Sequence, residues 1–135
     1  MNGGEGNMKK NIVKEKSFAF ALRIVNVCKY LQSEKKEFIL SKQLLRSGTA
    51  IGALVCESEH AESKADFIHK IAIAQKETNE TEYWIELLFQ SNYLNEAEYK
   101  SIITNSIELK KILASISIST KEKYKKPNLS MPEIG

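Results

Sequence analysis

The spacing of apolar residues constrains the fold of this chain more than any other feature. Between residues 12 and 121 they recur every three or four positions, and proline occurs only at positions 127 and 132. This periodicity is typical of amphipathic helices, and no segment shows the alternation of a strand. The connections between the periodic segments are short. The sequence therefore predicts an all-α fold, an antiparallel up-down-up-down four-helix bundle.

The first helix, expected over about residues 13–33, has an unusually apolar surface. Its clearly polar residues between positions 18 and 31 form one narrow stripe, made of Arg23, Asn26 and Lys29. This leaves more apolar surface than one face of a bundle can hide, so we expect part of it to meet another subunit. The apolar residues concerned are Phe18, Phe20, Leu22, Ile24, Val25, Val27, Cys28 and Leu31.

Capping signals give the boundaries of the other three helices. Ser41 is a plausible N-cap for the second helix, which should end near Glu59, and the segment 34–37 before it is too polar to be core. Ser63-x-x-Asp66 and Asn95-x-x-Glu98 fit the capping box that opens a helix. The fourth helix should then present a core-facing stripe of Ile102, Ile103, Ile107, Leu109, Ile112, Leu113 and Ile116.

The length of 135 residues fits one domain. We expect a disordered N-terminus over residues 1–11, the bundle over residues 12–120 and a disordered basic tail over residues 121–135. Cys28 and Cys56 indicate reduced thiols in a cytoplasmic protein. The first ten residues lack the apolar segment of a signal peptide, and no apolar run is long enough to cross a membrane. The sequence gives no sign of a cofactor.

Charge is unevenly distributed along the chain, although the net charge is only +3. Residues 1–56 carry ten Lys and Arg against four acids, residues 57–98 carry three against ten, and residues 99–135 carry seven against three. A bundle with this distribution suits either an anionic partner or the association of unlike faces.

Basic residues near both ends of the chain give the main functional signal. An even number of antiparallel helices brings the two termini together. The two clusters could therefore form one patch that contacts phosphates and gives salt-sensitive nucleic-acid binding. The alternative is a pair of solvated termini that serve solubility. The candidate phosphate contacts are Lys14, Lys16, Arg23, Lys121, Lys123, Lys125 and Lys126.

A second group of charged residues lies on the second and third helices. Its members either line a groove or pore, or form salt bridges that fix the helix register, and the second interpretation is favoured. They are Arg46, Glu57, Lys76, Glu77 and Glu80. Gly48 and Gly52, one turn apart, predict a close approach by a neighbouring helix that offsets the cost of glycine in a helix.

Metal and catalytic sites are not supported by the sequence. Glu57-x-x-His60 and Asp66-x-x-His69 share the spacing of the Glu-x-x-His pairs in bundle di-iron sites. The first helix, however, lacks a mid-helix carboxylate, so we expect no metal. No catalytic triad or phosphate-binding loop is present, and we expect no enzymatic activity.

Two motifs resemble a known family. They are Gln43-Leu-x-Arg46-Ser-Gly-x-x-Ile51-Gly-Ala-x-x-x-Glu57, and Asp66-Phe-Ile-x-Lys70 continuing into Lys76-Glu77-x-x-Glu80-Thr-x-x-Trp84. The chain resembles the bacterial four-helix-bundle proteins encoded within intervening sequences of large-subunit ribosomal RNA genes. The accessory variability protein of diversity-generating retroelements is related to them. The resemblance implies a homopentameric barrel. The related accessory variability protein binds nucleic acid through basic surfaces.

Two functions follow from these observations. The first is a non-enzymatic accessory protein that binds structured RNA or DNA through the basic residues. The second is a protein-interaction scaffold assembled as a homo-oligomeric ring, with its acidic third helix or its intersubunit grooves facing a partner protein. A contiguous positive surface favours the first, and basic residues dispersed among acids favour the second.

Overall fold

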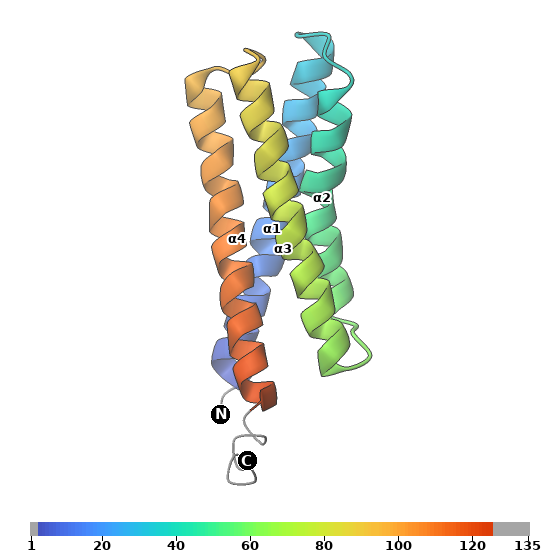
Figure 1. Ribbon diagram of the computed structural model, residues 1–135, viewed down its shortest axis with the longest axis vertical. Coiled ribbons are helices and arrows are strands. Elements are labelled where there is room, and N and C mark those ends of the chain that lie inside the picture. The colour runs from blue at the N-terminus through green and yellow to red at the C-terminus, as the bar shows by residue number, and fades with distance from the viewer. Residues whose placement is uncertain (1–2, 126–135) are drawn as a thin grey trace, which may run out of the picture.

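The computed structural model describes residues 3–125, and the side chains of residues 8–123. Four helices follow one another along this part of the chain: α1 (Gly3–Ser33), α2 (Leu40–Ser58), α3 (Lys64–Gln90) and α4 (Glu96–Lys125). Within the described residues there is no strand. Figure 1 shows the four helices side by side, with the start of α1 and the end of α4 at the same end of the bundle. The predicted all-α four-helix bundle is confirmed.

Contacts between side chains give the direction of each helix. Along α1 the residues Lys9, Lys16 and Arg23 meet Ser119, Glu108 and Ser101 in that order, so α4 runs opposite to α1. The same reversal relates α1 to α2, α2 to α3 and α3 to α4. Each helix packs on its neighbours in the chain, α4 closes on α1, and the α1–α4 contact is the sparsest of the four.

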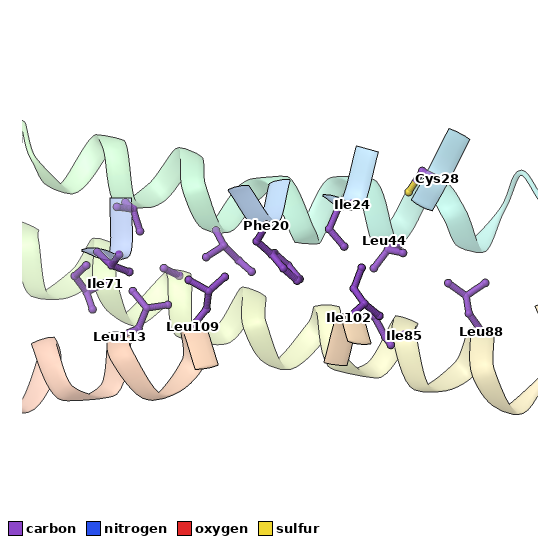
Figure 2. Close-up of a cluster of buried hydrophobic side chains, with 14 of the residues drawn as sticks. Phe20, Ile24, Cys28, Leu44, Ile71, Ile85, Leu88, Ile102, Leu109 and Leu113 are labelled. Carbon is purple, nitrogen blue, oxygen red and sulfur yellow. The ribbon is translucent and has the colours of Figure 1, made fainter. Parts of the chain in front are cut away.

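The core is a continuous column of aliphatic side chains between the helices. Figure 2 shows Phe20, Ile24 and Cys28 of α1 facing side chains from the other three helices. On α4 the expected stripe is largely correct. Ile102, Leu109, Leu113 and Ile116 are buried, and Ile103 and Ile112 are half-buried. Ile107 is 37% exposed and does not belong to the core.

The first and last helices extend beyond the expected limits of the bundle. Residues 3–11 and 121–125, which we expected to be disordered, are helical. Lys9 at the start of α1 contacts Ser119 of α4, so packing extends into this region. Helix α4 continues to Lys125, the last residue that the structure describes. Residues 1–2 and 126–135 of the expected disordered segments lie outside the described residues.

The two predicted capping boxes open α3 and α4. Ser63 Oγ accepts a hydrogen bond from the backbone N–H of Asp66 at 3.0 Å, and Asn95 Oδ1 accepts from Glu98 at 2.8 Å. Glu98 completes its box by accepting from the Asn95 N–H at 2.8 Å. The Asp66 carboxylate reaches one residue further back and accepts from the N–H of Glu62.

The predicted cap of α2 is wrong, and Glu37 takes its place. The helix begins at Leu40, and the Glu37 carboxylate accepts from the backbone N–H groups of Ile39, Leu40 and Ser41 at 3.1, 2.9 and 2.7 Å. One anionic side chain thereby satisfies three unpaired donors at the helix start. Glu37 is buried for this reason, although the segment 34–37 had seemed too polar to be core.

The end of α3 is a Schellman motif with asparagine in the usual glycine position. The N–H of Tyr93 bonds to the Leu88 carbonyl at 2.8 Å, and the N–H of Asn92 bonds to the Phe89 carbonyl at 3.0 Å. Asn92 has a φ of 71°, in the left-handed region that asparagine tolerates better than most residues. This turn directs the chain from α3 back into α4.

Gly48 and Gly52 permit the predicted close approach by a neighbouring helix, and the structure shows that this helix is α1. A Cβ atom on Gly48 would lie 2.8 Å from Cγ1 of Ile24, and one on Gly52 would lie 3.3 Å from the carbonyl oxygen of Ser17. The absence of side chains therefore lets α1 and α2 approach closely. Ser17 and Ile24 are both buried at this contact.

Candidate functional site

The basic termini meet at one end of the bundle. Lys9 Nζ donates to Ser119 Oγ at 3.3 Å, which joins the start of α1 to the last part of α4. Lys10 Nζ lies 4.7 Å from the ring centre of Phe67 at the start of α3. Lys121 and Lys123 are exposed on the last turns of α4. We call Lys9, Lys10, Lys121 and Lys123 the terminal lysines.

Two of the predicted phosphate contacts lie outside the described side chains. Lys125 is the last residue of α4, and Lys126 follows the described part of the chain.

Two further predicted contacts, Lys14 and Lys16, pair with acidic residues, Glu59 at the C-cap of α2 and Glu108 on α4. Lys14 Nζ lies 3.2 Å from Glu59 Oε1, and Lys16 Nζ lies 3.0 Å from Glu108 Oε2. All four side chains are about one-third to one-half exposed. Such pairs contribute about 0–1 kcal/mol to stability. The positive charge of α1 is thus interspersed with acids along the α1–α2 and α1–α4 seams.

Arg23 is separate from the terminal lysines. It lies two turns beyond Lys16 on α1, and its guanidinium donates to the carbonyl oxygen of Ser101 at 3.3 Å, to Ser101 Oγ at 2.9 Å and to Asn105 Oδ1. These acceptors belong to α4 and carry no charge. The structure therefore does not bring Arg23 into a common patch with the basic termini.

The predicted polar network between α2 and α3 is centred on Arg46. Its guanidinium lies 3.4 Å from Glu77 Oε1 and also pairs with Glu80 Oε2. Trp84 Nε1 donates to the same Glu80 oxygen at 3.2 Å. Hydrogen bonds from Arg46 and then Trp84 lower the pKa of Glu80, and the hydrogen bond to Glu80 raises the pKa of Arg46. Arg46 is exposed, whereas Glu77, Glu80 and Trp84 are partly buried, and the group joins α2 to α3.

Glu57 and Lys76 do not join this network. Glu57 pairs with Lys70, whose Nζ lies 3.3 Å from Glu57 Oε1. This pair lies about three helical turns from Arg46 along α2. Lys76 is exposed. The sequence prediction missed Lys70 and Trp84, although both lie in the motifs that carry the family resemblance. The antiparallel register of α2 and α3 determines which acid meets which base, and periodicity alone does not provide that register.

The outward face of α1 carries large apolar side chains, as the sequence predicted. Phe18 is 65% exposed and Leu22 is 53% exposed, one turn apart on the side opposite the buried Phe20 and Ile24. Met8 and Ile12 continue the exposed apolar surface toward the start of the helix. We call Met8, Ile12, Phe18 and Leu22 the outer α1 face.

The two cysteines have different surroundings. Cys28 is buried between α1 and the start of α2, and its thiol donates to the carbonyl oxygen of Ser41 at 3.2 Å. Burial, assisted by the nearby Glu37 carboxylate, raises the pKa of Cys28 to about 12. Cys56 is exposed on α2.

His60 and His69 are both exposed. Among the described residues, no three His, Cys, Asp or Glu side chains lie close enough together to hold a metal ion. No helix within the same part of the chain is sufficiently long and apolar to cross a membrane.

Comparisons with known proteins place this arrangement in a family. A crystal structure from Bacteroides thetaiotaomicron, described as a protein with unknown function from the S23 ribosomal protein family, is 56% identical in sequence. It matches with a TM-score of 0.80 over 81% of this chain and 97% of that chain. A comparison with curated proteins gave no significant match. The family model described as 23S rRNA-intervening sequence protein matches residues 9–115. The chain therefore belongs to the 23S rRNA-intervening sequence protein family.

Proposed function

We propose that this protein is a non-enzymatic interaction scaffold that works as a homo-oligomer, assembled through the outer α1 face. The observation that carries the proposal is the exposure of Phe18 and Leu22 on the side of α1 that faces away from its own core. Burying a side chain of this size stabilises an interface by about 1.5–3 kcal/mol. Association would therefore remove an apolar surface that a monomer leaves in water. The family resemblance supplies five as the expected number of subunits.

The distribution of charge supports a scaffold rather than a nucleic-acid-binding surface as the main role. Lys14, Lys16 and Lys70 each pair with a glutamate from another helix, as do Arg46 and Lys110. Basic residues dispersed among acids do not produce the continuous positive potential that attracts a phosphate backbone. They suit a surface that recognises another protein through a pattern of both charges.

Substitution of the outer α1 face tests the proposal. We expect the variant with Phe18→Ser and Leu22→Ser to sediment as a smaller species than the wild-type protein, while its circular dichroism remains helical. Phe38→Ser is the matched control, because Phe38 is also half exposed but lies in the turn between α1 and α2. An unchanged sedimentation coefficient for the double variant, or an equal loss with the Phe38 variant, would show that the outer α1 face is not the interface.

Nucleic-acid binding is a second candidate function, and the terminal lysines favour it. Four lysines from the two ends of the chain gather at one end of the bundle. In an oligomer this cluster would be repeated on every subunit, and avidity would strengthen a weak phosphate contact. Binding of this type depends steeply on salt and little on sequence.

Titration of a structured RNA across a salt series tests this second candidate. Replacing Lys9, Lys10, Lys121 and Lys123 by glutamine should weaken binding and reduce its salt dependence. The matched control replaces four exposed lysines elsewhere, namely Lys29, Lys42, Lys100 and Lys111, and removes the same charge. If both quadruple variants bind RNA like the wild-type protein, or if neither they nor the wild-type protein bind, the terminal lysines are not a nucleic-acid site.

A further inference from the structure

A cleft of about 470 Å³ opens between α1 and α4, close to the turn that joins α3 to α4. It lies where the packing between helices is sparsest. The apolar part of its wall comes from Val27, Leu94 and Ile102, and Tyr30 lies toward the α3–α4 turn. Arg23 and Ser101 lie toward the middle of the bundle. This volume is within the range of clefts that hold small organic molecules.

Arg23 gives the cleft a positive charge held in a fixed position. Its guanidinium is anchored on Ser101 and Asn105 of α4, and none of these acceptors is an acid. A guanidinium has five N–H donors, and three bonds to described residues leave two N–H groups for another acceptor. Within the described residues Arg23 forms no ion pair.

The acid in the wall of this cleft limits the ligands that fit. Glu98 lies one turn from Ser101 along α4, and its carboxylate accepts from the Asn95 N–H as part of the helix cap. Arg23 can neutralise one negative charge of a head group, whereas a second charge would meet Glu98 and no further basic side chain of the cleft wall. A single carboxylate at Arg23 matches the planar guanidinium and can accept two parallel N–H bonds.

We propose that the α1–α4 cleft binds an amphipathic monocarboxylate, with its head group at Arg23 and its aliphatic chain over Val27, Leu94 and Ile102. The chain would run from the middle of the bundle toward Tyr30 and the α3–α4 turn. Binding would add contact between α1 and α4 where the bundle has least. The terminal lysines are not part of the cleft wall.

Calorimetric titration of the full-length protein with octanoate tests the site. We expect saturable binding of one octanoate per chain. Acetate, which lacks the chain, and octan-1-ol, which lacks the charge, should each bind at least about tenfold more weakly, because each loses one of the two contributions. Absence of saturable octanoate binding, or equal affinity for octanoate and octanol, would overturn the proposal.

Three variants locate the ligand. Arg23→Gln should weaken octanoate binding about tenfold and leave octanol binding unchanged. Lys111→Gln removes the same charge from an exposed position of α4 outside the cleft, and should bind octanoate like the wild-type protein. Ala97→Trp fills the cleft, leaves the contacts of Arg23 in place and should weaken both ligands. Unchanged octanoate affinity in the Arg23 and Ala97 variants, or an equal loss with the Lys111 variant, would refute the assignment.

Discussion

The contact between Gly48 and Ile24 permits a quantitative test of the packing of α2 on α1. Replacing Gly48 with alanine should stabilise an isolated helix by up to about 1 kcal/mol. In the bundle, however, the new Cβ would lie 2.8, 3.0 and 3.2 Å from Cγ1, Cγ2 and Cδ1 of Ile24, which is fully buried. Crowding of this kind in a packed core costs about 1–3 kcal/mol. The two effects together predict a net loss of about 1 kcal/mol for Gly48→Ala.

A double-mutant cycle separates the two effects. Ile24→Ala alone should cost about 2–5 kcal/mol, because it leaves a cavity. In that background the three close contacts no longer exist, so Gly48→Ala should become stabilising by up to about 1 kcal/mol. Gly52→Ala is a milder comparison within the same helix, since its Cβ would meet the Ser17 carbonyl oxygen at 3.3 Å. Its effect should be smaller than that of Gly48→Ala.

The free energies of unfolding would be measured by chemical denaturation, followed by far-UV circular dichroism. All variants must be compared at one protein concentration, because self-association would shift apparent stability. We expect the effect of Gly48→Ala on the free energy of unfolding to change sign between the wild-type and Ile24→Ala backgrounds. If Gly48→Ala stabilises the wild-type protein as much as it stabilises the Ile24→Ala variant, close packing at Gly48 is not what requires glycine.

Three further predictions concern single residues. Glu37→Gln should lower the free energy of unfolding by about 1–3 kcal/mol, since it replaces an accepting oxygen at the start of α2 with a donor; equal denaturation midpoints would contradict the cap. Asn92→Gly should raise stability by about 0.5–1 kcal/mol because glycine adopts a positive φ without strain, and a lower thermal midpoint would argue against this. Cys28 should resist iodoacetamide at pH 8 while Cys56 reacts, because burial and a pKa of about 12 keep Cys28 protonated; mass spectrometry showing two adducts on the folded protein would refute this.

The raised pKa of Cys28 also makes the stability of the folded protein depend on pH. Burial raises the pKa of Cys28 in the folded protein above its ordinary value of 9.0. The neutral thiol therefore stabilises the folded state fully below pH 9, and this contribution is lost as the pH rises from about 9 toward 12. Cys28→Ala should lose less stability than the wild-type protein over that rise.

Local sequence signals predicted the helices well. Ser63 and Asn95 act as caps because a cap needs only residues three positions apart, and such spacing is visible in the chain. The cap of α2 was missed because Glu37 reaches it from a turn in which Lys36 has a positive φ of 53°. That conformation is not encoded by an obvious turn residue such as glycine.

Contacts between distant residues were predicted less well. Lys14 and Lys16 pair with Glu59 and Glu108, and these partners depend on how α1 is rotated and aligned against α2 and α4. Helical periodicity identifies which residues share a face but does not specify the register between two helices. For the same reason the sequence suggested Arg23 as a phosphate contact. The structure instead places Arg23 in the wall of the α1–α4 cleft, and no sequence motif indicates this cleft.

Assembly through the outer α1 face would bury an apolar surface that one chain leaves in water. Light scattering coupled to size-exclusion chromatography, at micromolar concentration, measures this most directly. We expect a molar mass that is a multiple of the 15.3 kDa chain, with five subunits expected from the family resemblance. A monodisperse species of 15.3 kDa at every concentration tested would contradict it.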